Sequence, residues 1–126
     1  MSKPLFESGD FVLRSGAETD WRINAEALDA SSIATIACMI ADRVGPFCAV
    51  RGIPTGGGGG PLAKALEPYR SDEGPLLVVD DVLTTGVSME EYADYFGMLD
   101  TVYYVIFDRS GGLRPSWVKA LWTLDV

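Results

Sequence analysis

The chain has 126 residues, of which 48% are hydrophobic and 22% are charged, a composition typical of one globular domain rather than of a disordered chain. Its formal net charge is −8 and it has no Lys/Arg-rich run, so no nucleic-acid partner is expected. No apolar stretch approaches the roughly 20 residues of a membrane helix, and the first residues lack the apolar segment of a secretory signal, so we expect a cytoplasmic protein with no membrane partner.

The cysteine content and the lack of histidine limit the metal chemistry of the chain. Cys38 and Cys48 lie in apolar surroundings, which predicts two free, buried thiols. The sequence has no histidine and no close cysteine pair, so a zinc-type site is not expected.

The first elements alternate between helix and strand. Apolar residues recur at spacings of three and four over residues 26–44, which predicts a helix that ends at Gly45-Pro46. The apolar run 47–50 predicts a short buried strand. A proline in the first turn predicts a short helix over residues 61–66, after a glycine tract.

The second half continues the alternation. Residues 75–79 form a buried-strand pattern that ends at two acids, and residues 88–97 have a helical pattern. The β-branched and aromatic run 101–107 predicts a third buried strand, and 117–124 a final one. We therefore expect an α/β fold over residues 1–126: one domain with a parallel sheet and flanking helices. Ligands of such sheets bind at the carboxyl ends of the strands.

Residues 78–88 place unusual chemistry at a strand end. An apolar strand runs into Asp80 and Asp81, and a Thr-Thr-Gly turn then leads into a helix. Gly86 allows close backbone approach, and the open N–H groups of a helix start favour a phosphate. The two carboxylates suit ribose hydroxyls or a hydrated Mg²⁺. The alternative is that the acids end a strand and the hydroxyls cap a helix; the repulsion between adjacent acids favours the ribose 5-phosphate interpretation.

The segment from Val78 to Ser88 resembles the signature of type I phosphoribosyltransferases. The resemblance implies binding of 5-phosphoribosyl-1-pyrophosphate and Mg²⁺. It assigns catalytic roles on the ribose, and indirect contact with the metal, to Asp80 and Asp81. It assigns the 5′-phosphate to Thr84, Thr85, Gly86, Val87 and Ser88, and it places Val82 and Leu83 among the substrate-binding residues.

Three further segments resemble orotate phosphoribosyltransferases within that family. Arg51 and Gly52 open a glycine-rich segment similar to their pyrophosphate loop, although a flexible linker is the alternative there. Arg14, in a Phe-Val-Leu-Arg-Ser-Gly opening, is implied to lie near substrate. Arg109 stands in an Asp-Arg step after the third strand and is implied to meet an anionic base; a charged turn is the alternative.

One part of the family pattern is missing. The orotate enzymes carry a long mobile hood with a catalytic lysine before the paired-acid strand, whereas residues 67–75 here predict only a turn. Loss of one cationic group at such a site costs on the order of 10²–10³ in rate. The sequence therefore predicts a slow enzyme, or one completed by another subunit or protein, with Lys64 and Arg70 as candidate local cations.

The expected function is transfer of a phosphoribosyl group to a nucleobase, most simply an orotate-like pyrimidine, with release of pyrophosphate. The resemblance also implies a homodimer. One alternative is a non-catalytic module that binds phosphoribosyl compounds or nucleotides. Another is an interaction protein built on a degenerate fold.

Overall fold

The computed structural model describes residues 5–12, 18–23, 27–53, 59–84, 87–96 and 100–124. In this part of the chain, a four-stranded sheet has the order β3-β4-β5-β6, and a separate hairpin pairs β1 with β2. All neighbouring strands of the four-stranded sheet are parallel. Its strands are β3 (Ala49–Gly52), β4 (Leu76–Leu83), β5 (Thr101–Asp108) and β6 (Val118–Thr123). The predicted α/β fold with a parallel sheet is thus confirmed.

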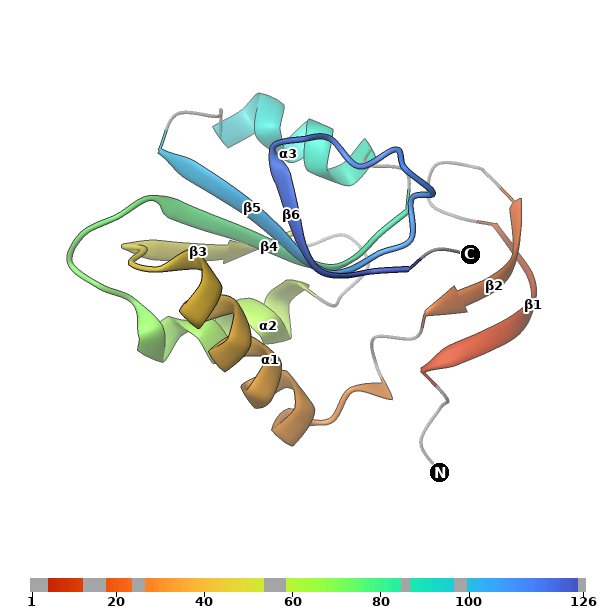
Figure 1. Cartoon of the computed structure of the whole chain (residues 1–126), viewed down its shortest axis with the longest axis horizontal. Helices are drawn as coiled ribbons and strands as arrows, with labels where there is room; N and C mark the ends of the chain where they lie inside the picture. Colours follow the sequence, from red (N-terminus) through yellow and green to blue (C-terminus); the bar gives the residue numbers. More distant parts are fainter. Residues whose placement is uncertain are drawn as a thin grey trace.

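Helices cover both faces of this sheet (Figure 1). Helices α1 (Ala30–Val44) and α2 (Gly59–Leu66) lie on one face, and α3 (Val87–Phe96) lies on the other. Each face has its own apolar cluster. The first cluster includes Ile36, Ile40, Leu62, Leu66, Leu77, Val79 and Ile106. The second includes Ile53, Val78, Leu83, Met89, Tyr103, Val105 and Val118.

Helix α1 begins later than predicted. Its first residue is Ala30 rather than residue 26, because Asp29 caps it: the Asp29 carboxylate accepts the Ser32 backbone N–H at 2.8 Å. The helix ends where predicted, at Gly45, which has a φ of 80°. The left-handed backbone there favours glycine.

The limits of β3 and β4 differ from the predicted ones because hydrogen bonds to other segments determine where these two strands begin and end. Strand β3 starts at Ala49 rather than Phe47, since Phe47 and Cys48 bond instead to residues 71 and 75 of the segment before β4. Strand β4 does not end before the acids but continues to Leu83, because β5 pairs with it as far as Leu83–Asp108. The prediction of a strand that stops at Asp80 is therefore wrong.

The hairpin of β1 (Phe6–Val12) and β2 (Glu18–Ile23) was not predicted as strands. The two strands are antiparallel, with Phe6 opposite Ile23, and their register shifts between Ser8 and Phe11. Glycine and aspartate within Phe6–Val12 disfavour strand locally. The antiparallel pairing with β2 stabilises a strand that the local sequence alone does not favour.

Both cysteines are free, as predicted, but they are exposed rather than buried. Cys38 follows buried Ala37 on α1, and a step of one residue on a helix turns the side chain by about 100° away from the core. Apolar neighbours in sequence were therefore a poor guide to burial here. No described helix is long and apolar enough to cross a membrane.

Candidate functional site

The carboxyl ends of β3, β4 and β5 meet at one edge of the sheet. Gly52 pairs with Val79, so Asp80 and Asp81 follow just beyond the end of β3. Leu83 pairs with Asp108, and the Arg109 backbone N–H donates to the Leu83 carbonyl at 3.0 Å, which places Arg109 beside Thr84. The fold thus gathers the described candidate residues of β3, β4 and β5 at the edge where parallel sheets bind ligands.

The two acids are held by the backbone that follows each of them. The Asp81 N–H donates to Oδ1 of Asp80 at 2.8 Å, and the Val82 N–H donates to Oδ1 of Asp81 at 2.7 Å. Asp80 is only 5% exposed, whereas Asp81 is half-buried. Each carboxylate is therefore fixed against the strand, and such fixed acceptors suit ribose hydroxyls better than mobile ones would.

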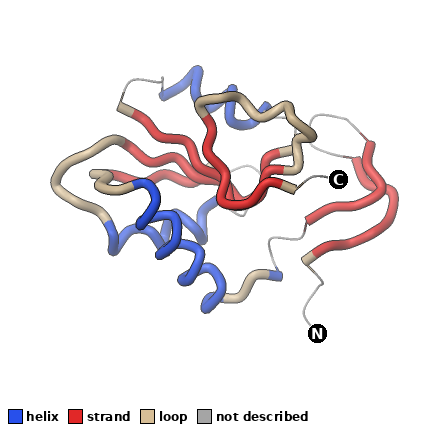
Figure 2. Tube along the Cα trace, in the orientation of Figure 1, coloured by secondary structure: helices blue, strands red, loops and turns tan. Residues whose placement is uncertain are grey.

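At the level of these acids, the side chains of β4 switch the face of the sheet to which they point. The ladder between β4 and β5 contains the pairs Asp80–Val105 and Val82–Phe107, but Asp81 between them is not paired in this ladder. Residues four apart on a regular strand share a face, yet Val79 packs with α1 and α2 while Leu83 packs on the α3 side. At this change of face, the Asp80 and Asp81 carboxylates accept the backbone N–H groups of Asp81 and Val82. Figure 2 shows that the strands bend in their second halves.

The corner after β4 leads directly into α3. Thr84 is half-buried, and α3 begins at Val87, so the first-turn N–H groups of a ten-residue helix follow the strand end closely. Val87 and Ser88 belong to that first turn. Thr85 and Gly86 lie outside the described residues. The corner therefore has the strand-to-helix connection that a phosphate site needs.

The end of β3 adds backbone groups. The Ile53 N–H donates to the Val79 carbonyl at 2.9 Å; since alternate residues of a strand face its neighbour, the Gly52 N–H points to the open edge of β3. The Gly52 carbonyl accepts from the Tyr92 hydroxyl of α3 at 3.4 Å, a contact that sequence reasoning missed. Arg51 is exposed on the same strand, and residues 54–58 lie outside the described chain.

The end of β5 contains a second buried acid that sequence reasoning missed. Asp108 is 2% exposed, and its carboxylate accepts from the Ser110 N–H at 2.9 Å, the Ser110 hydroxyl at 2.6 Å and Arg114 Nε at 2.8 Å. Arg109, half-buried, lies between two residues that are fixed in this way. Arg14, the other basic candidate, lies outside the described residues.

The proposed local cations are not at this edge, so that prediction is wrong. Arg70 follows α2 on the way to the amino end of β4, and it pairs with Glu67 at 2.6 Å. Lys64 lies in the last turn of α2, toward the same end. The rise of a strand places Leu76 about 13 Å from Asp80, so Arg70, near the amino end of β4, lies far from the acids, and Lys64 lies in the turn of α2 nearest that same end.

The segment that stands in place of a hood is short and anchored. A 3-10 helix, Glu67–Tyr69, begins it. The Ser71 N–H then donates to the Phe47 carbonyl at 2.8 Å, and the Cys48 N–H donates to the Pro75 carbonyl at 3.0 Å. Residues 67–75 thus form a short connection, as predicted, but it begins with a 3-10 helix where only a turn was predicted.

The site does not form a metal cage from protein groups alone. Among the described residues, no group of three or more His, Cys, Asp and Glu side chains is placed to hold a metal ion. Asp80 and Asp81 each also use an oxygen on a backbone N–H. The carboxylate oxygens that remain would fit a hydrated Mg²⁺ held by Asp80 and Asp81.

Comparison with solved structures identifies the fold. No protein-family model matches the sequence, and no curated protein matches it. The structure of Leishmania donovani UMP synthase matches with a TM-score of 0.76 and 18% identity, over 95% of this chain and 34% of that one. This chain thus spans about a third of that protein.

Two orotate phosphoribosyltransferases match over most of both chains. The enzyme from Aeropyrum pernix has a TM-score of 0.70 and 26% identity, covering 94% of this chain and 88% of its own. The Mycobacterium tuberculosis H37Rv enzyme, solved with inorganic phosphate, has a TM-score of 0.67 and 20% identity, covering 93% and 87%. The chain therefore has the fold of the type I phosphoribosyltransferases, in the form seen in orotate phosphoribosyltransferases.

Proposed function

We propose that this protein binds 5-phosphoribosyl-1-pyrophosphate with Mg²⁺ and transfers the phosphoribosyl group to an orotate-like pyrimidine, releasing pyrophosphate. The observation that carries the proposal is the pair of backbone-held acids, Asp80 and Asp81, directly before the corner that opens α3. The fold shared with orotate phosphoribosyltransferases supports it.

The proposed roles follow from the chemistry of each group. The acids accept from the ribose hydroxyls, and the first-turn amides of α3 with the 84–88 corner hold the 5′-phosphate. Arg51 and the Gly52 N–H face the pyrophosphate, and Arg109 and Arg14 face the anionic base. A bound Mg²⁺ would neutralise charge on the pyrophosphate.

The reaction is a substitution at C1 of the ribose. A ring nitrogen of the base forms the new bond to C1, and the bond from C1 to the pyrophosphate oxygen breaks with its electron pair. Positive charge develops on the sugar ring and negative charge on the leaving group, so fixed carboxylates near the ribose and cations near the pyrophosphate both favour the transition state. We expect a slow enzyme that acts as a cytoplasmic homodimer.

The test is direct. Purified protein is incubated with the sugar pyrophosphate, Mg²⁺ and orotate, uracil or a purine base, and the nucleotide product is measured. The Asp80→Asn/Asp81→Asn variant is the matched control, since it retains side-chain size and hydrogen-bond acceptors. Formation of nucleotide by the wild type and not by the variant supports the proposal; no product from any base contradicts transferase activity.

A non-catalytic binding module is the second candidate. The anchored connection 67–75, with Arg70 held at the opposite end of the sheet, favours it because no cation on this segment lies near the acids. Calorimetry with the sugar pyrophosphate or a nucleoside monophosphate distinguishes the two. Binding without turnover supports this second function, and absence of binding contradicts both.

A further inference from the structure

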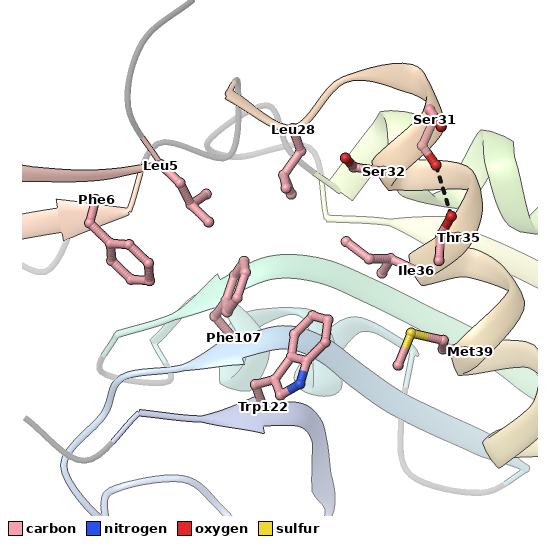
Figure 3. Close-up of a pocket in the computed structure, with 10 residues that line it drawn as sticks. All are labelled: Leu5, Phe6, Leu28, Ser31, Ser32, Thr35, Ile36, Met39, Phe107 and Trp122. Carbon is pink, nitrogen blue, oxygen red and sulfur yellow. Dashed lines mark hydrogen bonds between the residues drawn. The ribbon is translucent and has the colours of Figure 1, made fainter.

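A cavity of about 550 Å³ lies apart from the candidate phosphoribosyl site. The N-terminal segment before and within β1 forms one wall, α1 forms a second, and the ends of β5 and β6 form a third (Figure 3). None of the described residues assigned to the phosphoribosyl group or to the base lines it. Its volume falls in the range of small-molecule sites, about 300–1,000 Å³.

The sheet wall of the cavity is aromatic. The rings of Phe107 and Trp122 stack with centroids 5.5 Å apart and an interplanar angle of 25°. Phe6 lines the same cavity from the start of β1, as Figure 3 shows. Trp122 is 41% exposed, so part of its ring surface remains accessible to a ligand.

The cavity selects against charge. The described side chains that line it are aliphatic, aromatic, thioether or hydroxyl groups, and none of these described side chains is ionisable. A charged ligand would lose hydration without gaining a partner charge, which is costly. A neutral, mainly apolar ligand is the chemistry that fits.

The helix wall adds a directional acceptor. Ser31, Ser32 and Thr35 line the cavity from the first turns of α1. The Thr35 hydroxyl donates its proton to the Ser31 carbonyl at 3.1 Å, as the dashed line in Figure 3 marks. A hydroxyl has one proton and two lone pairs, so Thr35 Oγ1 is left to accept from a ligand.

We propose that this cavity binds a neutral aromatic small molecule that carries an N–H or O–H donor on one edge. Its rings lie against Phe107 and Trp122, and its donor points to Thr35 Oγ1. This site is independent of the proposed transferase function, because no described residue belongs to both.

The primary test uses N-phenyl-1-naphthylamine, a neutral aromatic probe with one N–H whose fluorescence rises in apolar surroundings. We expect saturable binding to the full chain, and displacement by indole at lower concentration than by 1-methylindole, which has no donor. Absence of saturable binding, or equal displacement by the two indoles, overturns the proposal.

Variants then locate the site. Thr35→Val removes the acceptor at nearly constant size, and we expect indole to bind about 2- to 10-fold more weakly while 1-methylindole is unchanged. Trp122→Ser should weaken both ligands, whereas Leu113→Ser, which removes an exposed apolar side chain that does not line the cavity, should weaken neither. Equal effects of Trp122→Ser and Leu113→Ser would contradict the assignment. The assignment would also be contradicted if light scattering showed a dimer and the probe did not bind to that dimer. The second copy of the chain would then cover the cavity.

Discussion

Asp108 and Arg114 form an ion pair of 2.8 Å that ties the end of β5 to the segment leading into β6. Arg114 also donates to the Val118 carbonyl at the start of β6. Parallel strands usually need a crossover of about a dozen residues or more, commonly a helix, but residues 109–117 make this one without a helix. The ion pair thus replaces part of the packing that a helix would provide, and it fixes the chain on both sides of Arg109.

Arg114→Met should destabilise the protein. The variant leaves the Asp108 carboxylate, 3% exposed, without its counter-charge, and we expect a loss of about 2 kcal/mol, less than for a fully buried pair because the Arg114 side chain is 35% exposed. Arg43→Met, on the exposed surface of α1, is the control and should change stability by less than about 0.5 kcal/mol. Urea unfolding measures both, and equal midpoints for the two variants would refute a stabilising role for the pair.

Gly74→Ala should be more destabilising than Gly111→Ala. Both glycines have positive φ, 108° and 67°, but a Cβ on Gly74 would lie 2.3 Å from the Pro46 carbonyl oxygen, while one on Gly111 would meet nothing within 4 Å. We expect a cost of about 1–2 kcal/mol at Gly111 from the left-handed backbone alone, and a larger loss at Gly74 because backbone must shift. Thermal unfolding of the two variants compares them. A smaller loss at Gly74 would mean that residues 71–75 are not held as tightly against residues 46–48 as their hydrogen bonds indicate.

Substitutions at Asp81 should separate ligand binding from stability. Asn keeps an oxygen for the Val82 N–H, so Asp81→Asn should unfold within about 1 kcal/mol of wild type, whereas Asp81→Ala leaves that N–H without its acceptor and should lose about 1–3 kcal/mol. Both should weaken binding of the sugar pyrophosphate at least about tenfold, because a charge-assisted bond to ribose is lost. Calorimetry and urea unfolding give the two readouts, and Asp72→Asn, exposed at the opposite end of the sheet, is the control. Unchanged affinity in Asp81→Asn would remove Asp81 from the proposed site.

The cap of α1 should be sensitive to acid. Hydrogen bonds from the Ser32 backbone and side chain hold the pKa of Asp29 below its ordinary value of 3.8. A carboxyl group with a lowered folded-state pKa stabilises the fold above its unfolded pKa, and this stabilisation is lost as the pH falls through the folded value. The stability of wild type relative to Asp29→Asn should therefore be constant near neutral pH and decline as the pH drops through 3.8 and below. Urea midpoints of both proteins from pH 7 to pH 2.5 test this, and parallel curves would exclude a contribution from the Asp29 charge.

Some features of the site depended only on local sequence. The order of helices and strands from α1 to β6, although not the β1–β2 hairpin, was predictable because hydrophobic period and turn chemistry act over a few neighbouring residues. The end of α1 at Gly45 and the strand from Thr101 were found for the same reason.

The sequence by itself determined that this chain is an α/β protein with paired acids after an apolar strand segment, since burial periodicity and residue chemistry are properties of short segments. Only the tertiary structure decided that β4 continues through the acids, that Arg70 lies at the wrong end of the sheet, and that Asp108 pairs with Arg114. The cavity between Phe6, Thr35 and Trp122 also forms only in the tertiary structure. These features arise from contacts between residues far apart in the chain, and no local pattern specifies which distant partner will supply a hydrogen bond, a counter-charge or a wall.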